Sequence, residues 1–173
     1  VQTADEAETE KVAGCFTATY NGSKLEILVE PADEPNNFKI KVKGIKRNPS
    51  GGQVEVDWDA SGIGGGTTGN MQFDVPATGK FVVISTKVVQ APQQAIYIVF
   101  SDLLEKQQGF EGLIDVDGFS QLKFDLSKNV LRIYLPQTVQ DVRTLKVYQG
   151  IQNNLGEKLS EEFGLMIYDG KQR

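Results

Sequence analysis

The sequence predicts an all-β protein made of two consecutive small antiparallel β-sandwich domains. Apolar residues recur at every second position over short stretches, as the pleat of a half-buried strand requires. Gly, Pro, Asn and Asp bound these stretches, and almost no stretch has helical periodicity. About twelve such stretches are present, which is too many for one small sandwich and suits two.

The expected strands succeed one another at short intervals along the whole chain. They cover residues 15–20, 24–30, 38–43, 54–59, 71–75, 81–89, 95–100, 113–116, 121–125, 130–135, 144–148 and 164–168. Near Gly79-Lys80 a loop-rich, acidic half gives way to a more densely stranded half. We therefore expect a disordered acidic segment at 1–11, a small sandwich domain of unassigned family at 12–79, and a second sandwich domain at 80–173.

The pairing register of the first hairpin can be predicted from its turn, because Asn21-Gly22 favours a two-residue turn with positive φ at both positions. The resulting register is Tyr20 with Ser23, Ala18 with Leu25, and Phe16 with Ile27. The last two pairs share one face, which we assign to the core. Asn21-Gly22-Ser23 also spells a glycosylation sequon, but the turn is the favoured interpretation.

A second register is indicated by charge, because strand 38–43 alternates lysines with apolar residues and strand 54–59 alternates acids with apolar residues. A hairpin centred on Pro49 gives the pairs Lys43–Glu55, Lys41–Asp57, Lys39–Asp59, Val42–Val56 and Ile40–Trp58. This register places opposite charges across from each other on one face and apolar side chains across from each other on the other face. The lysine stripe, including Lys46, is therefore interpreted as a solvated strand face rather than as a site for an anionic ligand.

Composition excludes several classes of protein. The 173 residues include no histidine and one cysteine, Cys15. Histidine-dependent triads, an internal disulfide, a zinc ribbon and an iron–sulfur cluster are thus excluded within one chain. Cys15 is expected to be a buried strand thiol, although Val12-Ala13-Gly14-Cys15 superficially spells a lipobox. A net charge of −5 argues against nucleic acid or an anionic membrane as partner. No run of 18 apolar residues is present.

Three groups of residues were considered as candidates for a binding or catalytic site. Gly64, Gly66 and Gly69 match G-x-G-x-x-G, but a strand rather than a helix is expected after them, so we expect no nucleotide site. Asp57 with Asp59 and Asp115 with Asp117 are acid pairs, which are interpreted as strand and turn residues. The alternatives are a loop calcium site at Asp115 to Gly118 and an enzyme that acts through paired carboxylates. Five tyrosines could in principle offer rings to a sugar, namely Tyr20, Tyr97, Tyr134, Tyr148 and Tyr168.

The second half carries a specific series of motifs. They are Gln94-Ala-Ile-Tyr-Ile-Val-Phe-Ser-Asp-Leu-Leu, Gly112-Leu-Ile-Asp-Val-Asp-Gly, Asn129-Val-Leu-Arg-Ile-Tyr-Leu-Pro and Gly150-Ile-Gln-Asn-Asn-Leu-Gly-Glu-Lys-Leu. This order resembles the first macroglobulin-like domain of bacterial alpha-2-macroglobulin family proteins, over about residues 80–165. The resemblance implies that 80–173 is a macroglobulin-like β-sandwich domain and that the two sandwiches are of the immunoglobulin-like or macroglobulin-like type. The matched residues have plain roles in a fold: a core strand, a capped turn, bends and a strand end.

The resemblance implies the N-terminal, non-catalytic scaffold of a bacterial protease trap, an exported and lipid-anchored protein of the periplasm or cell surface. Its implied partners are neighbouring domains of the same chain and target proteases met by the full-length protein, with a membrane reached only through an N-terminal lipid anchor outside this sequence. The Cys-x-Glu-Gln thioester motif of such traps is absent, since Phe16-Thr17-Ala18 comes directly after Cys15. We expect no catalytic residue, cofactor or metal, and the binding residues are unknown. The alternative is a cell-surface adhesion or glycan-binding module.

Overall fold

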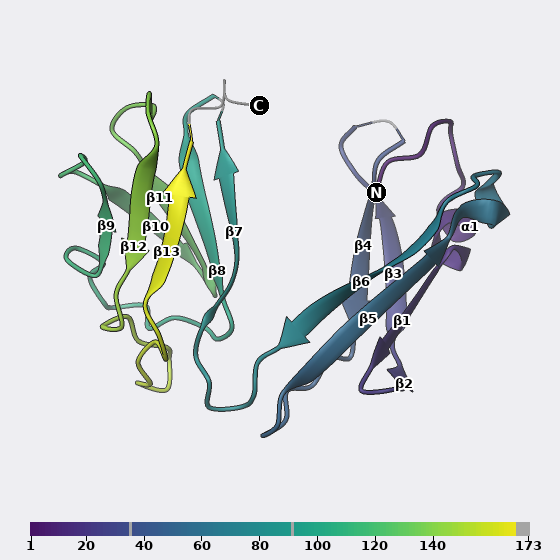
Figure 1. Ribbon diagram of the computed structural model, residues 1–173, viewed down its shortest axis with the longest axis horizontal. Coiled ribbons are helices and arrows are strands. Elements are labelled where there is room, and N and C mark those ends of the chain that lie inside the picture. Colours follow the sequence, from purple (N-terminus) through teal and green to yellow (C-terminus); the bar gives the residue numbers. More distant parts are fainter. Residues whose placement is uncertain (35, 91, 169–173) are drawn as a thin grey trace. The chain divides into compact units, whose positions relative to one another are not determined.

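The computed structural model describes residues 1–34, 36–90 and 92–168, and it confirms the all-β fold (Figure 1). Apart from two short helical segments, its regular elements are strands in small antiparallel sheets. The chain divides into two compact units, Val1–Thr78 (unit 1) and Gly79–Arg173 (unit 2). Within the described ranges, no helix has the length and apolar character needed to cross a bilayer.

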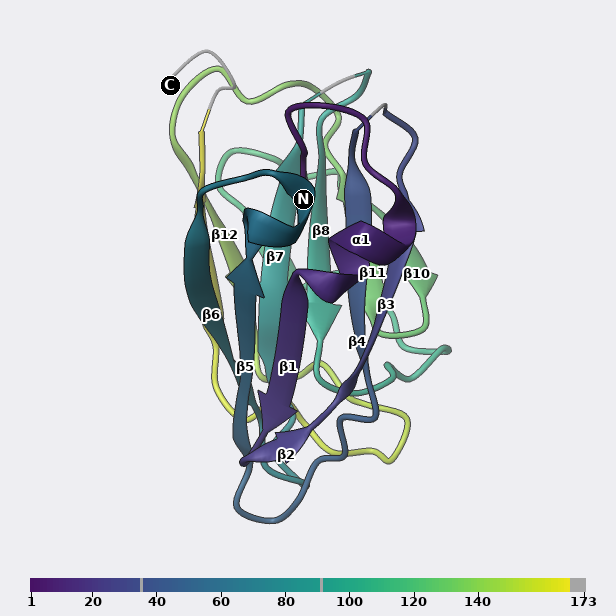
Figure 2. The same cartoon turned by 90° about the vertical axis from the view of Figure 1, so that its right-hand side faces the viewer.

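Unit 1 consists of a short helix and six strands (Figure 2). The elements are α1 (Thr9–Gly14), β1 (Phe16–Tyr20), β2 (Ser23–Lys24), β3 (Glu26–Pro31), β4 (Phe38–Lys43), β5 (Gly52–Asp59), a 3₁₀ turn (Ala60–Ile63) and β6 (Thr68–Val75). One sheet has the strand order β2-β1-β5-β6, and the other contains only β3 and β4. A sheet of two strands therefore faces a sheet of four.

The first hairpin has the predicted register only near its turn. Asn21 and Gly22 have φ of 48° and 81°, Tyr20 pairs with Ser23, and the Leu25 amide donates to the Ala18 carbonyl at 2.8 Å. The predicted pair of Phe16 with Ile27 is wrong. Phe16 pairs with Trp58 of β5, and Ile27 pairs with Val42 of β4. The chain changes sheets after Leu25, so β1 and β2 belong to the four-stranded sheet and β3 belongs to the two-stranded sheet.

The predicted pairing of the lysine strand with the acidic strand is also wrong. β4 pairs with β3, so Lys43 lies opposite Glu26 and Lys39 opposite Glu30, whereas β5 pairs with β1 and β6. The connection between β4 and β5 passes from one sheet to the other. It bends at Gly44 and Gly51, which have φ of 82° and 68°. The lysines do have acidic partners, Lys43–Glu26 at 3.7 Å and Lys41–Glu30 at 2.5 Å.

The first residues of the chain differ from the disordered segment that the sequence predicts for 1–11. The amide of Phe38 donates to the Val1 carbonyl at 2.7 Å, and α1 begins at Thr9. Val12 on α1 is fully buried and packs against Val29 and Phe38. This apolar contact anchors an otherwise acidic segment. Cys15 is a buried free thiol, but it caps α1 one residue before β1 instead of lying in a strand.

Unit 2 is a sandwich of four strands on three. The strands are β7 (Val83–Val89), β8 (Ala95–Phe100), β9 (Ile114–Val116), β10 (Lys123–Ser127), β11 (Val130–Tyr134), β12 (Arg143–Val147) and β13 (Phe163–Ile167). They form sheets of order β10-β11-β8-β7 and β13-β12-β9. The core residues include Ile96, Ile98 and Phe100 on β8 and Leu145 and Val147 on β12, all of them fully buried. The two inner faces thus cover one another.

Candidate functional site

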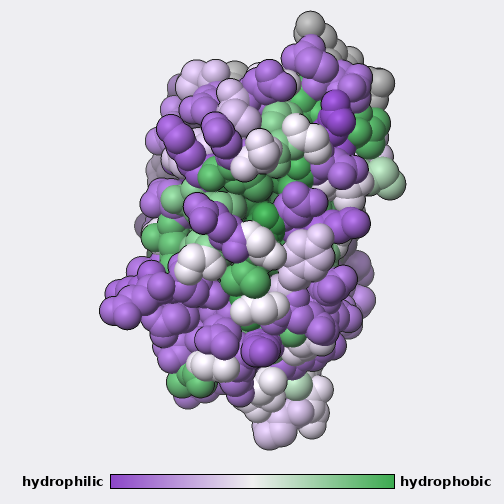
Figure 3. Space-filling view, turned by 90° about the vertical axis from the view of Figure 1, so that its left-hand side faces the viewer, coloured by the Kyte–Doolittle hydropathy of each residue, from purple (hydrophilic) through white to green (hydrophobic). Residues whose placement is uncertain are grey.

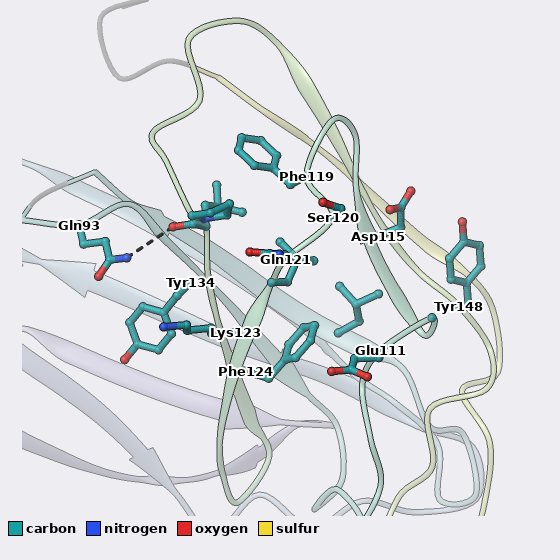
Figure 4. A pocket seen from close by; sticks show the side chains of 15 residues that line it. Gln93, Glu111, Asp115, Phe119, Ser120, Gln121, Lys123, Phe124, Tyr134 and Tyr148 are labelled. Carbon is teal, nitrogen blue, oxygen red and sulfur yellow. Dashed lines mark hydrogen bonds between the residues drawn. The ribbon is translucent and has the colours of Figure 1, made fainter.

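The candidate site is a pocket of about 950 Å³ at one side of unit 2 (Figure 4). β9 lies at the edge of the three-stranded sheet and β10 at the edge of the four-stranded sheet, and the pocket is lined by residues from both edges. The end of β11 with the two residues after it, Tyr148 after β12, and Gln93 before β8 also line the pocket. The aromatic and polar side chains that give the pocket its character are Glu111, Asp115, Phe119, Gln121, Phe124, Tyr134 and Tyr148.

A sharp turn after β9 shapes this pocket. Gly118 has φ of 79°, which a residue with a side chain adopts only with strain. A Cβ at this position would also lie 3.1 Å from Nη1 of Arg143. The amides on either side donate to backbone carbonyls, Asp117 to Thr144 at 3.0 Å and Phe119 to Val116 at 2.9 Å. The chain therefore turns at once and delivers Phe119 and the residues after it to the pocket.

The pocket combines apolar rings with polar groups. Phe119 and Phe124 contribute rings, and Phe124 is held by Phe110 with ring centroids 5.6 Å apart. Figure 4 shows Glu111, Asp115 and Tyr148 to one side of the two rings, with Tyr134 on the other side. Small-molecule sites commonly have this combination of apolar walls and a few polar groups that fix orientation.

The surface of the molecule on the side of unit 2 has the same mixed character. In Figure 3 hydrophobic residues gather near the middle of the face, and hydrophilic residues surround them. The exposed apolar residues of unit 2 include Leu155 and Met166. Scattered exposed apolar side chains are ordinary on soluble domains, so the pocket rather than this surface is the candidate site.

The acid pairs singled out from the sequence are not brought together into one centre. Asp115 lies in the pocket and opposite Lys146 on β12. Asp59 accepts a hydrogen bond from the Ser61 amide at 2.9 Å, and this bond holds the pKa of its carboxyl below the ordinary value. Asp57 lies opposite Asn70, not opposite a lysine as predicted. In the part of the chain that the structure describes, no group of three potential metal ligands is found.

The glycine-rich loop ends as the sequence predicts. Gly64 comes directly after a 3₁₀ turn and has φ of 79°, and β6 begins at Thr68. No helix N-terminus comes after these glycines to receive a pyrophosphate, so the dinucleotide-binding arrangement is not formed there. Gly69 has a different role: a Cβ on it would overlap the Trp58 ring, so glycine leaves room for that ring beside β6.

Two of the five tyrosines reach the pocket, namely Tyr134 and Tyr148. Tyr20 accepts a hydrogen bond from the Asn48 amide at 3.3 Å in unit 1. Tyr97 lies under the Arg132 guanidinium, and Tyr168 is exposed and contacts the Met166 sulfur at 3.7 Å. The tyrosines therefore do not form a single flat platform for a sugar.

Sequence reasoning missed the cluster around Arg132 on the outer face of the four-stranded sheet. The guanidinium carbon of Arg132 lies 4.5 Å from the centre of the Tyr97 ring and 5.3 Å from that of Tyr134. Nη1 of Arg132 also donates to the Tyr134 hydroxyl at 2.7 Å. The sequence did indicate that Arg132 and Tyr134 lie on the same, outer face of β11, because side chains two residues apart on a strand share a face. The contact with Tyr97 depended on the β8–β11 register, which no local pattern specifies.

The motifs that carry the family resemblance hold the sandwich together. Phe100 is fully buried and packs on Phe81 with ring centroids 5.6 Å apart. The Phe100 amide donates to the Asn129 carbonyl at 2.8 Å, and the Asn129 side-chain amide donates back to the Phe100 carbonyl at 2.8 Å. This reciprocal pair joins the Phe-Ser-Asp motif to the start of the Asn-Val-Leu-Arg motif.

The closing motif is built around the buried side chain of Asn153. Its Oδ1 accepts from the amides of Leu155 at 3.0 Å and Glu157 at 2.9 Å, and its Nδ2 donates to the Glu157 carboxylate at 2.8 Å. Gly156 has φ of 79° in the same turn. Ile151 and Leu159 of the motif are buried in the core, whereas Leu155 between them is exposed. The spacing Gly-Ile-x-Asn-x-x-Gly-x-x-Leu thus corresponds to a single turn, which the side-chain amide of Asn153 stabilises.

No protein-family model matches this chain, and no curated protein matches it significantly. A function for the chain therefore has to be argued from its fold, its pocket and the residue-level resemblance.

Proposed function

We propose that this chain forms non-catalytic N-terminal scaffold domains of a bacterial alpha-2-macroglobulin-like protease inhibitor. The observation that carries the proposal is the closing turn of unit 2, in which Asn153 makes three side-chain hydrogen bonds and Gly156 has positive φ. The residues of the resemblance that lie in this turn and in the Phe100–Asn129 pair thus have clear structural roles. Such roles favour a structural function over a catalytic one.

In this proposal unit 2 is the first macroglobulin-like domain, and unit 1 is a further sandwich before it. Its partners are the neighbouring domains of the full-length chain and, through them, the target proteases. The protein is exported to the periplasm or cell surface and held there by a lipid anchor. The four-on-three sandwich of unit 2 supports this role because both inner faces are buried, which suits a rigid spacer.

The test is to read the gene beyond the codon for Arg173. We expect further sandwich-sized β repeats, and a helical domain with Cys-x-Glu-Gln would make covalent capture testable with methylamine. Residues 1–173 alone should neither inhibit a panel of endopeptidases nor cleave their substrates. A stop codon soon after Arg173, or protease inhibition by these residues alone, would refute the proposal.

A second candidate function is saccharide binding at the unit 2 pocket. The mixed lining of Phe119, Phe124, Asp115 and Tyr148 is the specific observation that favours it, because sugars present apolar ring faces and hydroxyl groups together. A glycan array probed with residues 1–173 should then show specific binding that Tyr148→Ala abolishes. Tyr168→Ala is the matched control, since that exposed tyrosine is not among the pocket residues. Equal loss in both variants, or no binding, would exclude this function.

A further inference from the structure

The pocket of unit 2 has two ends of opposite charge, and they belong to different sheets. Asp115 lies on β9 at the edge of the three-stranded sheet, and Glu111 comes just before that strand. Lys123 begins β10 at the edge of the four-stranded sheet and lies opposite Tyr134. Figure 4 shows Lys123 beside Tyr134, away from Glu111 and Asp115. Among the described residues that line the pocket, the other side chains are uncharged.

The three charged groups do not neutralise one another. In the described part of the chain, neither acid forms an ion pair with Lys123. Asp115 also forms none with Lys146, although that lysine lies opposite it on β12. All three pocket charges are exposed. The pocket thus offers a ligand two carboxylates at one end and one ammonium group at the other.

Between these ends the lining consists of rings and neutral polar groups. Residues 119–122 connect the turn after β9 to the start of β10, so the chain itself crosses from the acidic end to the basic end. Phe119 and Phe124 supply apolar faces, and Ser120 and Gln121 supply a hydroxyl and an amide. A sugar ring matches this middle part, because it has apolar faces and hydroxyl groups.

The distance between the ends limits where the charges of a ligand can be. Packed sheets lie about 10 Å apart, and a lysine side chain is long and flexible. One sugar ring with charged groups on opposite sides can therefore reach both ends. A ligand with a single charge would pair with one end and cover the other end without pairing it, which weakens binding.

We propose that the unit 2 pocket selects a zwitterionic saccharide, whose ring carries an ammonium group on one side and a carboxylate on the opposite side. The ammonium group binds Glu111 and Asp115 and gains further from the nearby Tyr148 ring, and the carboxylate binds Lys123. This inference rests on saccharide binding at this pocket, the second candidate function above, and it names the class of sugar.

The test uses four forms of one sugar. The probe is the methyl glycoside of neuraminic acid, whose ring carries an amino group and a carboxyl group at opposite positions. The N-acetyl form lacks the positive charge, the carboxamide form lacks the negative charge, and the form with both changes is neutral. Each is titrated into residues 1–173 by calorimetry, with the amide NMR signals of residues 119–124 as a second readout. We expect the zwitterion to bind about tenfold more tightly than either singly charged form, and the preference to shrink at high salt.

Variants that remove one charged end assign the contacts. In Lys123→Gln the zwitterion and its carboxamide should bind equally, because the partner of the carboxylate is gone. In the double variant Glu111→Gln with Asp115→Asn, the zwitterion and its N-acetyl form should bind equally. Lys106→Gln and Glu161→Gln are the matched controls, since both residues are exposed and neither lines the pocket. Both controls should keep the full preference for the zwitterion.

The outcomes separate this inference from the function on which it rests. Equal affinities for all four forms would overturn the inference and leave saccharide binding in place. Tightest binding of a singly charged form, or loss of the preference in a control variant, would overturn it as well. If none of the four forms binds, the inference is wrong, and the glycan array with its Tyr148→Ala comparison then decides saccharide binding by itself.

Discussion

The two units of this chain reach different degrees of closure with similar strands. Among the residues that the structure describes, the main core of unit 2 holds 17 buried residues, whereas the cluster of unit 1 holds three, Val12, Val29 and Phe38. Both units use alternating strands and tight turns, so composition does not separate them. The difference lies in strand count: sheets of four and three strands cover one another, and a sheet of two leaves β6 uncovered. Whether the two sheets of a sandwich cover each other depends on how many strands each sheet contains. Local alternation in the sequence does not reveal that number.

The largest expected effect contrasts a core residue of unit 2 with an open one of unit 1. Leu145→Ala should lower the free energy of unfolding of unit 2 by about 2–5 kcal/mol, because Leu145 is fully buried. Phe73→Ala in unit 1 should cost about 1 kcal/mol. Hydrogen exchange with mass spectrometry in a denaturant series reports each unit separately. Equal losses in the two variants would contradict the contrast.

A buried polar residue provides the next test. Asn153→Ala should destabilise unit 2 by about 2 kcal/mol or more, because the amides of Leu155 and Glu157 lose their acceptor. Amide exchange should accelerate first across residues 150–159. Asn154→Ala is the control, since its side chain is exposed, and it should have almost no effect. If both variants behaved alike, Asn153 would not be what holds this turn.

In unit 1 the comparable test concerns Gly69. Gly69→Ala should destabilise unit 1 by about 1–3 kcal/mol and shift the tryptophan emission, because the new Cβ would overlap the Trp58 ring. Gly66→Ala is a matched control in the same loop region, with open space around the added Cβ. Unchanged emission in Gly69→Ala would show that Trp58 does not lie over this glycine.

The smallest effect is a pH dependence on β3. A hydrogen bond from Lys41, aided by the charges of Lys39 and Lys43, lowers the pKa of Glu30 below its ordinary value. The folded pKa is depressed, so the stabilisation is complete above the pKa of an unfolded glutamate, about 4.3. It is lost as the pH falls through the folded pKa. Glu30→Gln should flatten the acid limb of the unit 1 stability curve. An unchanged acid limb would refute this role.

The strands were predictable because alternation is local, and so was the Asn21-Gly22 turn. Which strand pairs with which could not be predicted from the sequence. β3 also presents acids to the lysines of β4, namely Glu26 and Glu30, so the presence of acidic partners alone could not decide between β3 and β5. The long-range pairing of β1 with β5 decided it.

The pocket of unit 2 was not predictable for a related reason. Its lining comes from four segments that are far apart in sequence, and no motif marks them as neighbours. Tyr148 and Asp115 were each noticed, but only the sandwich brings them to one side of Phe124. By contrast, Asn153 was visible within a ten-residue motif because its hydrogen-bond partners are local.

The passage of the chain from β4 to β5 across the two sheets also has a kinetic consequence. β5 pairs natively with β6 through a short local connection. Its other native pairing, with β1, must wait for a long loop to close, because Phe16 lies opposite Trp58 far along the chain. Until that loop closes, the lysine strand and the acidic strand are near neighbours with complementary charges, and a local hairpin between them forms faster. The register that charge predicts and the native fold rejects is therefore the expected kinetic trap. Refolding of unit 1 should accelerate when salt screens that hairpin.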